Sequence, residues 1–291
     1  MIDGVFEIDR LKERLVISLK NLKVKLYSDG ADIESILAQI SNPWVKGFTT
    51  NPTLMRKAAV LDYEAFARSL LHVVRDLPVS FEVFADEPKE MEAQALAIAS
   101  WGANVNVKIP VTNRAGVFMG PLIRGLSSAG VMLNVTAILT LEQVERVVTA
   151  LDPATPAIVS VFAGRIADTG VDPVPMMKCA AAMVHALPRA ELLWASPREL
   201  LNIFQADEAG CDIITIPADM LKKLDLVGRD LADYSLETVA MFHRDACASA
   251  YRIDTSAPAS GLLAEQAAGK LPHTVQIGQR PRVPAWLHNR V

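Results

Sequence analysis

The feature that most constrains the fold is a regular alternation of short apolar runs with longer segments of helical spacing, repeated eight times along the chain. Short runs rich in β-branched residues are typical of strands, and apolar residues recurring every three or four positions are typical of amphipathic helices. The expected strands are residues 23–28, 45–49, 79–84, 105–109, 131–135, 157–162, 192–195 and 212–216. The expected helices are residues 32–40, 63–74, 88–100, 118–129, 141–150, 173–186, 197–208 and 218–224.

This alternation predicts an α/β protein of the (β/α)8 TIM-barrel class. The expected strands are mostly apolar rather than alternating, which suits parallel strands covered on both faces. Eight such units in roughly 230 residues match the usual size of the barrel. A doubly wound open sheet is the competing architecture, but no Gly-x-Gly-x-x-Gly turn follows the first expected strand. We therefore expect a single catalytic barrel over residues 23–252, an N-terminal helical extension over 1–22 and an extended C-terminal tail over 253–291.

Composition narrows the classes of function. The chain has 291 residues, of which 51% are hydrophobic, and its 29 basic and 33 acidic residues give a formal charge of −4. This slightly acidic balance argues against binding along a nucleic-acid backbone. Three acidic residues within the first ten positions are unlike a secretory signal, and no apolar stretch reaches the length of a membrane span. We expect a cytoplasmic protein without nucleic-acid or membrane partners, in which Cys179, Cys211 and Cys247 are reduced thiols.

Polar side chains gather where the expected strands end, which in a barrel is where the active site forms. Asp29 ends the first strand, Glu82 lies in the third and Lys108 ends the fourth. The other polar residues at or just after strand ends are Asn51, Asn134, Thr136, Ser160, Arg165, Ser196 and Arg198. The eighth expected strand adds no obvious polar group.

Lys108 is the most informative of these residues, because apolar neighbours flank it at the end of an expected buried strand. Desolvation and nearby cations favour a free amine, which can attack a carbonyl and form a Schiff base. Asp29 and Glu82 could serve the proton transfers that such chemistry needs. The alternative is structural: a lysine whose ammonium is solvated or paired with one of these carboxylates.

Arg165 and Arg198 follow the sixth and seventh expected strands, the region where many barrels bind phosphate. A guanidinium group matches a phosphate dianion with two parallel hydrogen bonds, so a sugar phosphate is the expected ligand. Surface ion pairing is the alternative for both arginines. No His or carboxylate spacing suggests a metal site, and we expect neither a metal nor another cofactor.

Six segments, in order along residues 23–251, resemble the transaldolase family, including its fructose-6-phosphate aldolase branch. They are Gly47-Phe48-Thr49-Thr50-Asn51-Pro52-Thr53-Leu54, Val107-Lys108-Ile109-Pro110-Val111-Thr112, Asn134-Val135-Thr136-Ala137, Ser160-Val161-Phe162-Ala163-Gly164-Arg165, Ala195-Ser196-Pro197-Arg198 and Ala209-Gly210-Cys211-Asp212. The resemblance implies a metal-free aldol mechanism with Lys108 as the Schiff-base residue and Asp29 as the general acid and base. It also implies that Glu82 and Thr136 hold a water molecule that carries protons while the imine forms.

The resemblance further implies how substrate is held. Asn51, Asn134, Ser160 and Ser196 would bind the sugar, and Arg165 with Arg198 would bind its phosphate. By this resemblance, the aldolase branch carries a tyrosine at the position of Phe162 and a glutamine at the position of Glu82. The residues at both positions of this chain therefore look transaldolase-like.

The predicted function is transfer of a dihydroxyacetone unit between sugar phosphates or related sugars. The alternatives are a class I aldolase that releases free dihydroxyacetone, and a sugar-phosphate-binding barrel without turnover. The chain departs from the family pattern at Gly30, at Pro197 and in a loop at residues 112–116 that is one residue longer, where Arg114 could add a contact to an unusual substrate. The sequence identifies neither the sugars nor the oligomeric state, for which a homo-oligomer is one alternative.

Overall fold

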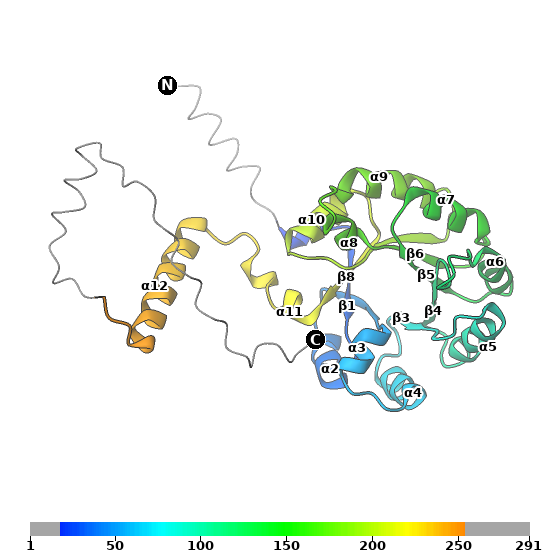
Figure 1. Ribbon diagram of the computed structural model, residues 1–291, viewed down its shortest axis with the longest axis horizontal. Helices are drawn as coiled ribbons and strands as arrows, with labels where there is room; N and C mark the ends of the chain where they lie inside the picture. Colours follow the sequence, from blue (N-terminus) through cyan, green and yellow to red (C-terminus); the bar gives the residue numbers. More distant parts are fainter. Residues whose placement is uncertain (1–17, 254–291) are drawn as a thin grey trace, which may run out of the picture. The chain divides into compact units, whose positions relative to one another are not determined.

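A computed structural model describes residues 18–253, and within that range the chain forms a closed barrel of eight parallel strands in sequential order (Figure 1). The strands are β1 Lys25–Asp29, β2 Val45–Thr49, β3 Val79–Glu82, β4 Val105–Pro110, β5 Leu133–Ile138, β6 Ala157–Val161, β7 Ala190–Trp194 and β8 Ile213–Pro217. β1 pairs with both β2 and β8, which closes the barrel. The predicted (β/α)8 architecture is confirmed.

Helices follow the strands and cover the outside of the barrel (Figure 1). They are α2 Ile33–Ile40, α3 Pro52–Lys57, α4 Tyr63–Val73, α5 Pro88–Ala99, α6 Gly120–Ser128, α7 Leu141–Ala150, α8 Ala163–Ala167, α9 Pro173–Val184, α10 Leu201–Glu208 and α11 Ala218–Leu221, with short 3-10 turns η1 Leu19–Asn21 and η2 Leu224–Leu226. A further helix, α12 Leu231–Ser249, comes after the barrel in the sequence. The sequence did not predict α3, α8 or α12. The first two are short and directly follow strands β2 and β6, so they extend the loops that surround the barrel mouth.

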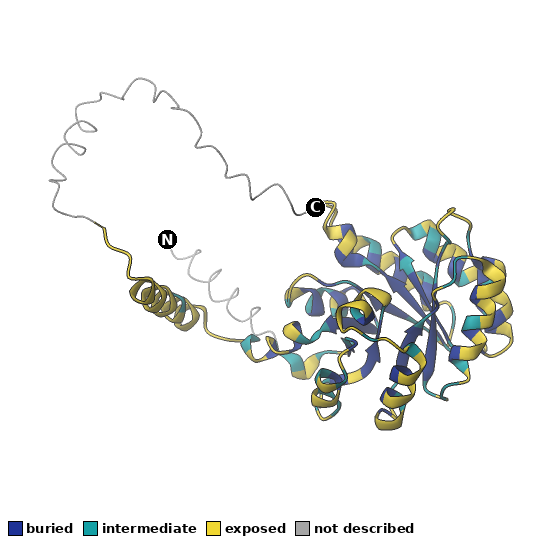
Figure 2. Ribbon diagram, turned by 60° about the horizontal axis from the view of Figure 1, so that its bottom comes forward, coloured by how far each residue is buried: buried dark blue, intermediate teal, exposed yellow. Residues whose placement is uncertain are grey.

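The main core lies between the strands and the helices, where the buried faces of both meet (Figure 2). Burying each large apolar side chain there contributes about 1.5–3 kcal/mol relative to leaving it exposed. A smaller cluster fills the barrel around Tyr27, with Ile158, Leu193 and Ile213 beside it. Gly47 makes room for this ring, because a Cβ at that position would lie 2.6 Å from the ring. The barrel is therefore filled by side chains and opens only toward its ends.

β5 has an irregularity that affects the barrel mouth. Its pairing with β6 shifts register between Val135 and Ile138, and Ala137 adopts a left-handed backbone with φ of 62°. Such bulges redirect side chains where they occur. The strand consequently runs three residues beyond the predicted end at 135 and carries Thr136 within it.

The chain divides into two compact units, residues 1–228 and 229–291. The barrel and η2 belong to the first. The described part of the second contains α12, none of whose side chains is buried. The barrel domain predicted from the sequence extends to residue 252, whereas the first compact unit ends at residue 228, so the two boundaries differ by residues 229–252. The division into domains stays a prediction.

The terminal segments fall largely outside the described residues. The helix predicted within residues 1–22 lies there except for residues 18–22, which include η1, and the predicted C-terminal tail lies there from residue 254 onward. No helix between residues 18 and 253 combines the length and apolarity needed to cross a membrane.

Candidate active site

The carboxyl ends of the strands open into a cavity of about 630 Å³. Eleven side chains predicted from the sequence as site residues all line it: Asp29, Asn51, Glu82, Lys108, Asn134, Thr136, Ser160, Phe162, Arg165, Ser196 and Arg198. These residues come from seven different strands or the loops that follow them. The structure thus brings the predicted set together, while the chemical role of each stays a prediction.

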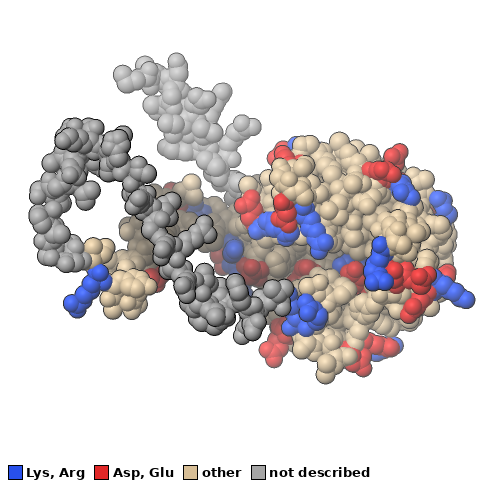
Figure 3. All heavy atoms as spheres, in the orientation of Figure 1, with Lys and Arg blue, Asp and Glu red and all other residues tan. Residues whose placement is uncertain are grey.

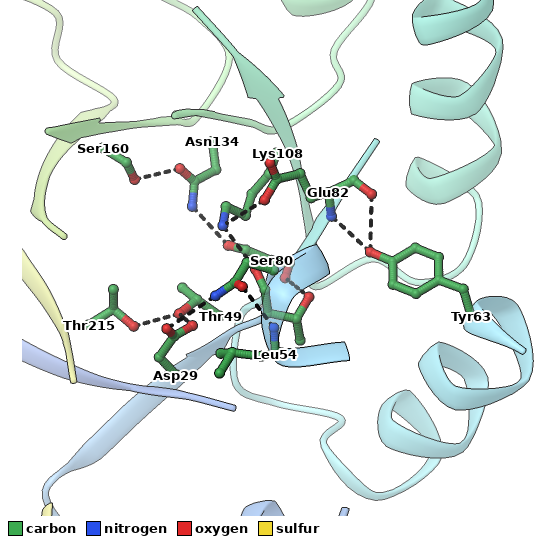
Figure 4. Close-up of polar contacts among 12 residues, drawn as sticks. Asp29, Thr49, Leu54, Tyr63, Ser80, Glu82, Lys108, Asn134, Ser160 and Thr215 are labelled. Atoms are coloured by element: carbon green, nitrogen blue, oxygen red, sulfur yellow. Dashed lines mark hydrogen bonds and ion pairs between the residues drawn. The ribbon is translucent and has the colours of Figure 1, made fainter. Parts of the chain in front are cut away.

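Lys108 lies on β4 and is only 7% exposed. Its Nζ donates a hydrogen bond to the Thr50 carbonyl at 2.9 Å and lies 3.1 Å from Oε2 of Glu82 (Figure 4). Glu82 is the register partner of Lys108 on the neighbouring strand β3, which is why the two side chains meet. A buried ammonium needs such partners to offset its desolvation. The ion pair considered from the sequence is present, and it holds the amine at the cavity wall.

Asp29 ends β1 and lines the same cavity. Its Oδ1 accepts a hydrogen bond from the Thr49 hydroxyl at 2.7 Å, and its Oδ2 accepts one from Nδ2 of Asn51 at 3.4 Å. Burial raises the pKa of Asp29, and this outweighs the opposing effects of Lys108 and of the two hydrogen bonds. A carboxyl group that holds its proton to higher pH than usual is suited to act as a general acid and base.

Asn51 also explains why α3 begins where it does. Its Oδ1 accepts a hydrogen bond from the Leu54 amide at 3.0 Å, and Pro52 occupies the first helical position. An asparagine cap followed by proline is a favoured helix start. The same side chain therefore starts α3 with its oxygen and contacts Asp29 with its nitrogen.

A buried hydrogen-bond chain links three strands at the base of the cavity (Figure 4). The Ser160 hydroxyl donates to Oδ1 of Asn134 at 2.6 Å, and Nδ2 of Asn134 donates to the Ser80 hydroxyl at 3.1 Å. This chain fixes the Asn134 amide. By contrast, the buried Thr136 hydroxyl has no hydrogen-bond partner among the described residues. An unpaired buried hydroxyl is costly, so this one is available for a substrate or a bound water.

The arginine side of the cavity is more open. Arg165 stacks on the ring of Phe162, with its Cζ 4.9 Å from the ring centre. Arg198 donates two hydrogen bonds to the Asp168 carboxylate, one of them from Nε at 2.8 Å, and both side chains are about half exposed. Hydrogen bonding to Arg198 lowers the pKa of Asp168. Arg198 therefore makes an ion pair of the kind considered from the sequence, and its guanidinium also lines the cavity, so its role stays a prediction.

The segments that carry these arginines, α8 and the loop after β7, touch through their backbones. A Cβ at Gly164 would lie 1.5 Å from the Ser196 carbonyl oxygen, so only glycine fits. The Gly164 amide donates to the Ala195 carbonyl at 3.3 Å, and Ser196 adopts a left-handed φ of 63°. These contacts join the end of β7 to the first turn of α8.

Several residues around the site were not predicted. Thr215 on β8 lines the cavity and shares a hydrogen bond with the Thr49 hydroxyl. Asp168 is the partner of Arg198, and Tyr63 on α4 hydrogen-bonds the backbone of Glu82. Thr215 is the sole polar residue within its strand, and that was the only signal in the sequence. Arg114 does not line the cavity, since its side chain contacts Asp86 instead.

Charges over the barrel are interspersed rather than gathered by sign on the face that Figure 3 shows. Between residues 18 and 253 there is no group of three or more His, Cys, Asp or Glu side chains that could hold a metal ion. The expectation that no cofactor is needed stays a prediction.

The fold and the cavity define a (β/α)8 barrel with a polar cavity at the carboxyl ends of its strands, where active sites of this fold lie. The family model described as Transaldolase/Fructose-6-phosphate aldolase matches residues 26–268. The chain belongs to this family.

Curated relatives support the assignment. The chain is 33% identical over 202 residues to a probable transaldolase of Dehalococcoides mccartyi, covering 69% of this chain and 90% of the relative. It is 32% identical over 216 residues to a probable transaldolase of Lactiplantibacillus plantarum, covering 73% and 95%. A solved structure of 2,3-dimethylmalate lyase aligns with a TM-score of 0.48 and 13% identity, over 86% of this chain and 94% of that one.

Proposed function

We propose that this chain is a transaldolase-like enzyme that transfers a dihydroxyacetone unit between sugar phosphates through a Schiff base on Lys108. The observation that carries the proposal is the placement of the Lys108 amine. It is buried, it lines a polar cavity, and it lies between the Glu82 carboxylate and the Thr50 carbonyl. Family membership supports the same assignment.

The first step joins the amine to the ketose. Neutral Lys108 attacks the substrate carbonyl and forms a carbinolamine, which loses water to give an iminium ion. Glu82 lies 3.1 Å from the amine and can accept its proton. The unpaired Thr136 hydroxyl can hold the water that carries this proton to the departing hydroxyl group.

The second step breaks the carbon–carbon bond. Asp29 accepts the proton of the hydroxyl group on the carbon beyond the bond, and the bonding electrons flow to the iminium nitrogen, giving an enamine and a free aldose. The raised pKa of Asp29 makes its carboxylate a better proton acceptor, which favours this transfer, and the protonated carboxyl is the proton donor in the reverse direction. Asn51, Asn134 and Ser160 hold the hydroxyl groups of the three-carbon fragment.

The third step needs an acceptor. The enamine attacks a second aldehyde, Asp29 returns the proton, and hydrolysis of the new iminium ion frees Lys108. Arg165 and Arg198 bind the phosphate of donor and acceptor, and Ser196 lies on the same loop as Arg198. Because this side of the cavity is exposed, acceptors of different length can be held at one phosphate site.

A second candidate is a class I aldolase that releases free dihydroxyacetone. Phe162 bears on the choice, because it lines the cavity beneath Arg165 but carries no hydroxyl group that could protonate the enamine. An enamine that is not protonated survives until an acceptor arrives, so Phe162 favours transfer.

The test is borohydride reduction in the presence of fructose 6-phosphate or dihydroxyacetone, followed by peptide mass analysis. We expect a reduced adduct on Lys108, and none in Lys108→Met. Product analysis with and without an acceptor aldehyde then separates the candidates, because an aldolase releases dihydroxyacetone without acceptor. Binding of sugar phosphate with no adduct from either ketose would overturn the proposal and favour a binding protein.

A further inference from the structure

The contacts between β2 and β3 show an interruption beside Lys108. The Phe48 amide donates to the Pro78 carbonyl at 2.9 Å, and the Thr50 amide donates to the Ser80 carbonyl at 3.1 Å. In a regular parallel ladder the next bond would run from the Glu82 amide to the Thr50 carbonyl.

The Thr50 carbonyl is used differently here. It accepts a hydrogen bond from Nζ of Lys108 at 2.9 Å. The Glu82 amide instead donates to the hydroxyl oxygen of Tyr63 at 2.9 Å, and that hydroxyl donates to the Glu82 carbonyl at 3.1 Å (Figure 4). One phenol group thus satisfies both backbone groups of Glu82 that face β2.

Tyr63 is held in place by its ring. It packs against Phe81, Phe84 and Trp101, with ring centres 6.1, 4.5 and 5.6 Å away. Aromatic contacts of this kind, two of them edge-to-face, restrict an aromatic side chain. Burial also raises the pKa of the Tyr63 phenol, so the group stays protonated and keeps both hydrogen bonds.

We infer that the Tyr63 hydroxyl is a positioning group for Lys108. It accepts the hydrogen bond of the Glu82 amide, and so leaves the Thr50 carbonyl to accept one from the lysine amine. The inference rests on the proposed function for its catalytic consequence. Without the hydroxyl, the Glu82 amide has no hydrogen-bond partner. The nearest replacement is the bond to the Thr50 carbonyl that a regular parallel ladder would contain. That bond would compete with Lys108 for the same carbonyl.

The main test is Tyr63→Phe, which keeps the ring and removes the hydroxyl. The variant should form the imine on Lys108 about tenfold more slowly, as expected when the charged amine loses its hydrogen bond to the Thr50 carbonyl. The KM for the ketose should stay within about twofold, because Tyr63 does not line the cavity. Trp101→Phe is the matched control, since it alters the same aromatic cluster but keeps the hydroxyl, and its imine formation should match the parent. Equal slowing in both variants, or no slowing in a folded Tyr63→Phe, would refute the inference.

Two structural measurements complete the test. A crystal structure of Tyr63→Phe should show the Glu82 amide bonded to the Thr50 carbonyl and Lys108 displaced from it; an unchanged Lys108 contact would count against the inference. Hydrogen exchange on the parent protein needs no variant to fold. The Glu82 amide should be protected like that of Thr50, and exchange at the rate of an unstructured amide would show that the hydroxyl bond is absent. If the parent forms no adduct on Lys108, the proposed function fails, whereas these two measurements still test the hydrogen bond itself.

Discussion

The two sides of the cavity differ in how their charged groups are held. On the β1–β4 side, Lys108 is buried and fixed by a carboxylate and a backbone carbonyl. On the β6–β7 side, Arg165 and Arg198 are exposed, and Arg198 is tied to the equally exposed Asp168. Buried charges depend strongly on each partner, whereas exposed pairs contribute about 0–1 kcal/mol and weaken with salt. Under the proposed function, the first side suits chemistry that needs fixed geometry, and the second suits binding that tolerates adjustment.

The largest expected effect comes from Lys108→Met. If Lys108 is the nucleophile, kcat for transfer should fall by roughly 10³-fold or more, because a methionine thioether cannot form the imine. The measurement is a coupled assay with fructose 6-phosphate and an acceptor aldehyde phosphate. Lys46→Met, at an exposed position of β2, is the control and should keep the parent rate. A comparable loss in both variants would mean that the buried side has no special role.

The next effect is expected from Asp29→Asn, which removes the acid and base but keeps a hydrogen-bond acceptor for Thr49. A proton-transfer group contributes on the order of 10²-fold or more to the rate, so kcat should fall by at least that factor. Imine trapping on Lys108 should persist, because the proposal places the role of Asp29 at the carbon–carbon bond and not at the imine. Loss of trapping together with kcat would assign Asp29 to imine formation instead.

The same variant tests the raised pKa of Asp29 through stability. With a higher pKa in the folded state, the folded protein binds the proton more tightly, so the contribution of this carboxyl to stability is present at acid pH. It is lost as the pH rises from the unfolded value through the folded one. Asp29→Asn should therefore have the higher Tm at neutral pH, with an advantage that shrinks on acidification. A variant that melts below the parent at pH 7 would contradict this sign.

On the exposed side, Arg198→Ala should raise the KM for a phosphorylated acceptor by about tenfold, as expected for loss of one charge-assisted contact. The rate of imine formation should change little, and glyceraldehyde, which lacks the phosphate, should show no change in KM. Arg68→Ala removes an exposed arginine that pairs along α4 and serves as the control. Equal effects on phosphorylated and unphosphorylated acceptors would remove Arg198 from the phosphate site.

The smallest effect is expected from Asp168→Asn. If Asp168 competes with phosphate for the Arg198 guanidinium, the variant should lower the KM for the phosphorylated acceptor by about twofold. The difference from the parent should shrink in high salt, since exposed charges are screened. A rise in KM would show that Asp168 orients Arg198 more than it competes for it.

The sequence predicted the barrel and its polar mouth because both depend on repeated local patterns. The strands alternate with helices, and parallel strands bring their carboxyl ends to one face, so the pattern alone places Asp29, Glu82 and Lys108 together. α3 and α8 were missed because helices of six and five residues show too little periodicity. α12 was missed because no strand follows it, so the alternation gave no signal.

Other features depend on distant contacts that no local pattern carries. Tyr63 meets Glu82 across 19 residues, and Asp168 meets Arg198 across 30. Thr215 lies within an apolar strand, and only the pairing of β1 with β8 brings it near Thr49. The Lys108 amine meets the Thr50 carbonyl across 58 residues, a contact that only the folded backbone brings about.

The close approach of Gly164 to Ser196 has a consequence for attempts to change acceptor preference by directed evolution. The two segments that carry Arg165 and Arg198 touch backbone to backbone, and no side chain fits between them. Libraries that diversify one segment alone will be filtered by the shape of the other, and variation at position 164 will mostly yield misfolded clones. Productive libraries should keep glycine there and randomise both segments jointly, treating them as a single heritable unit.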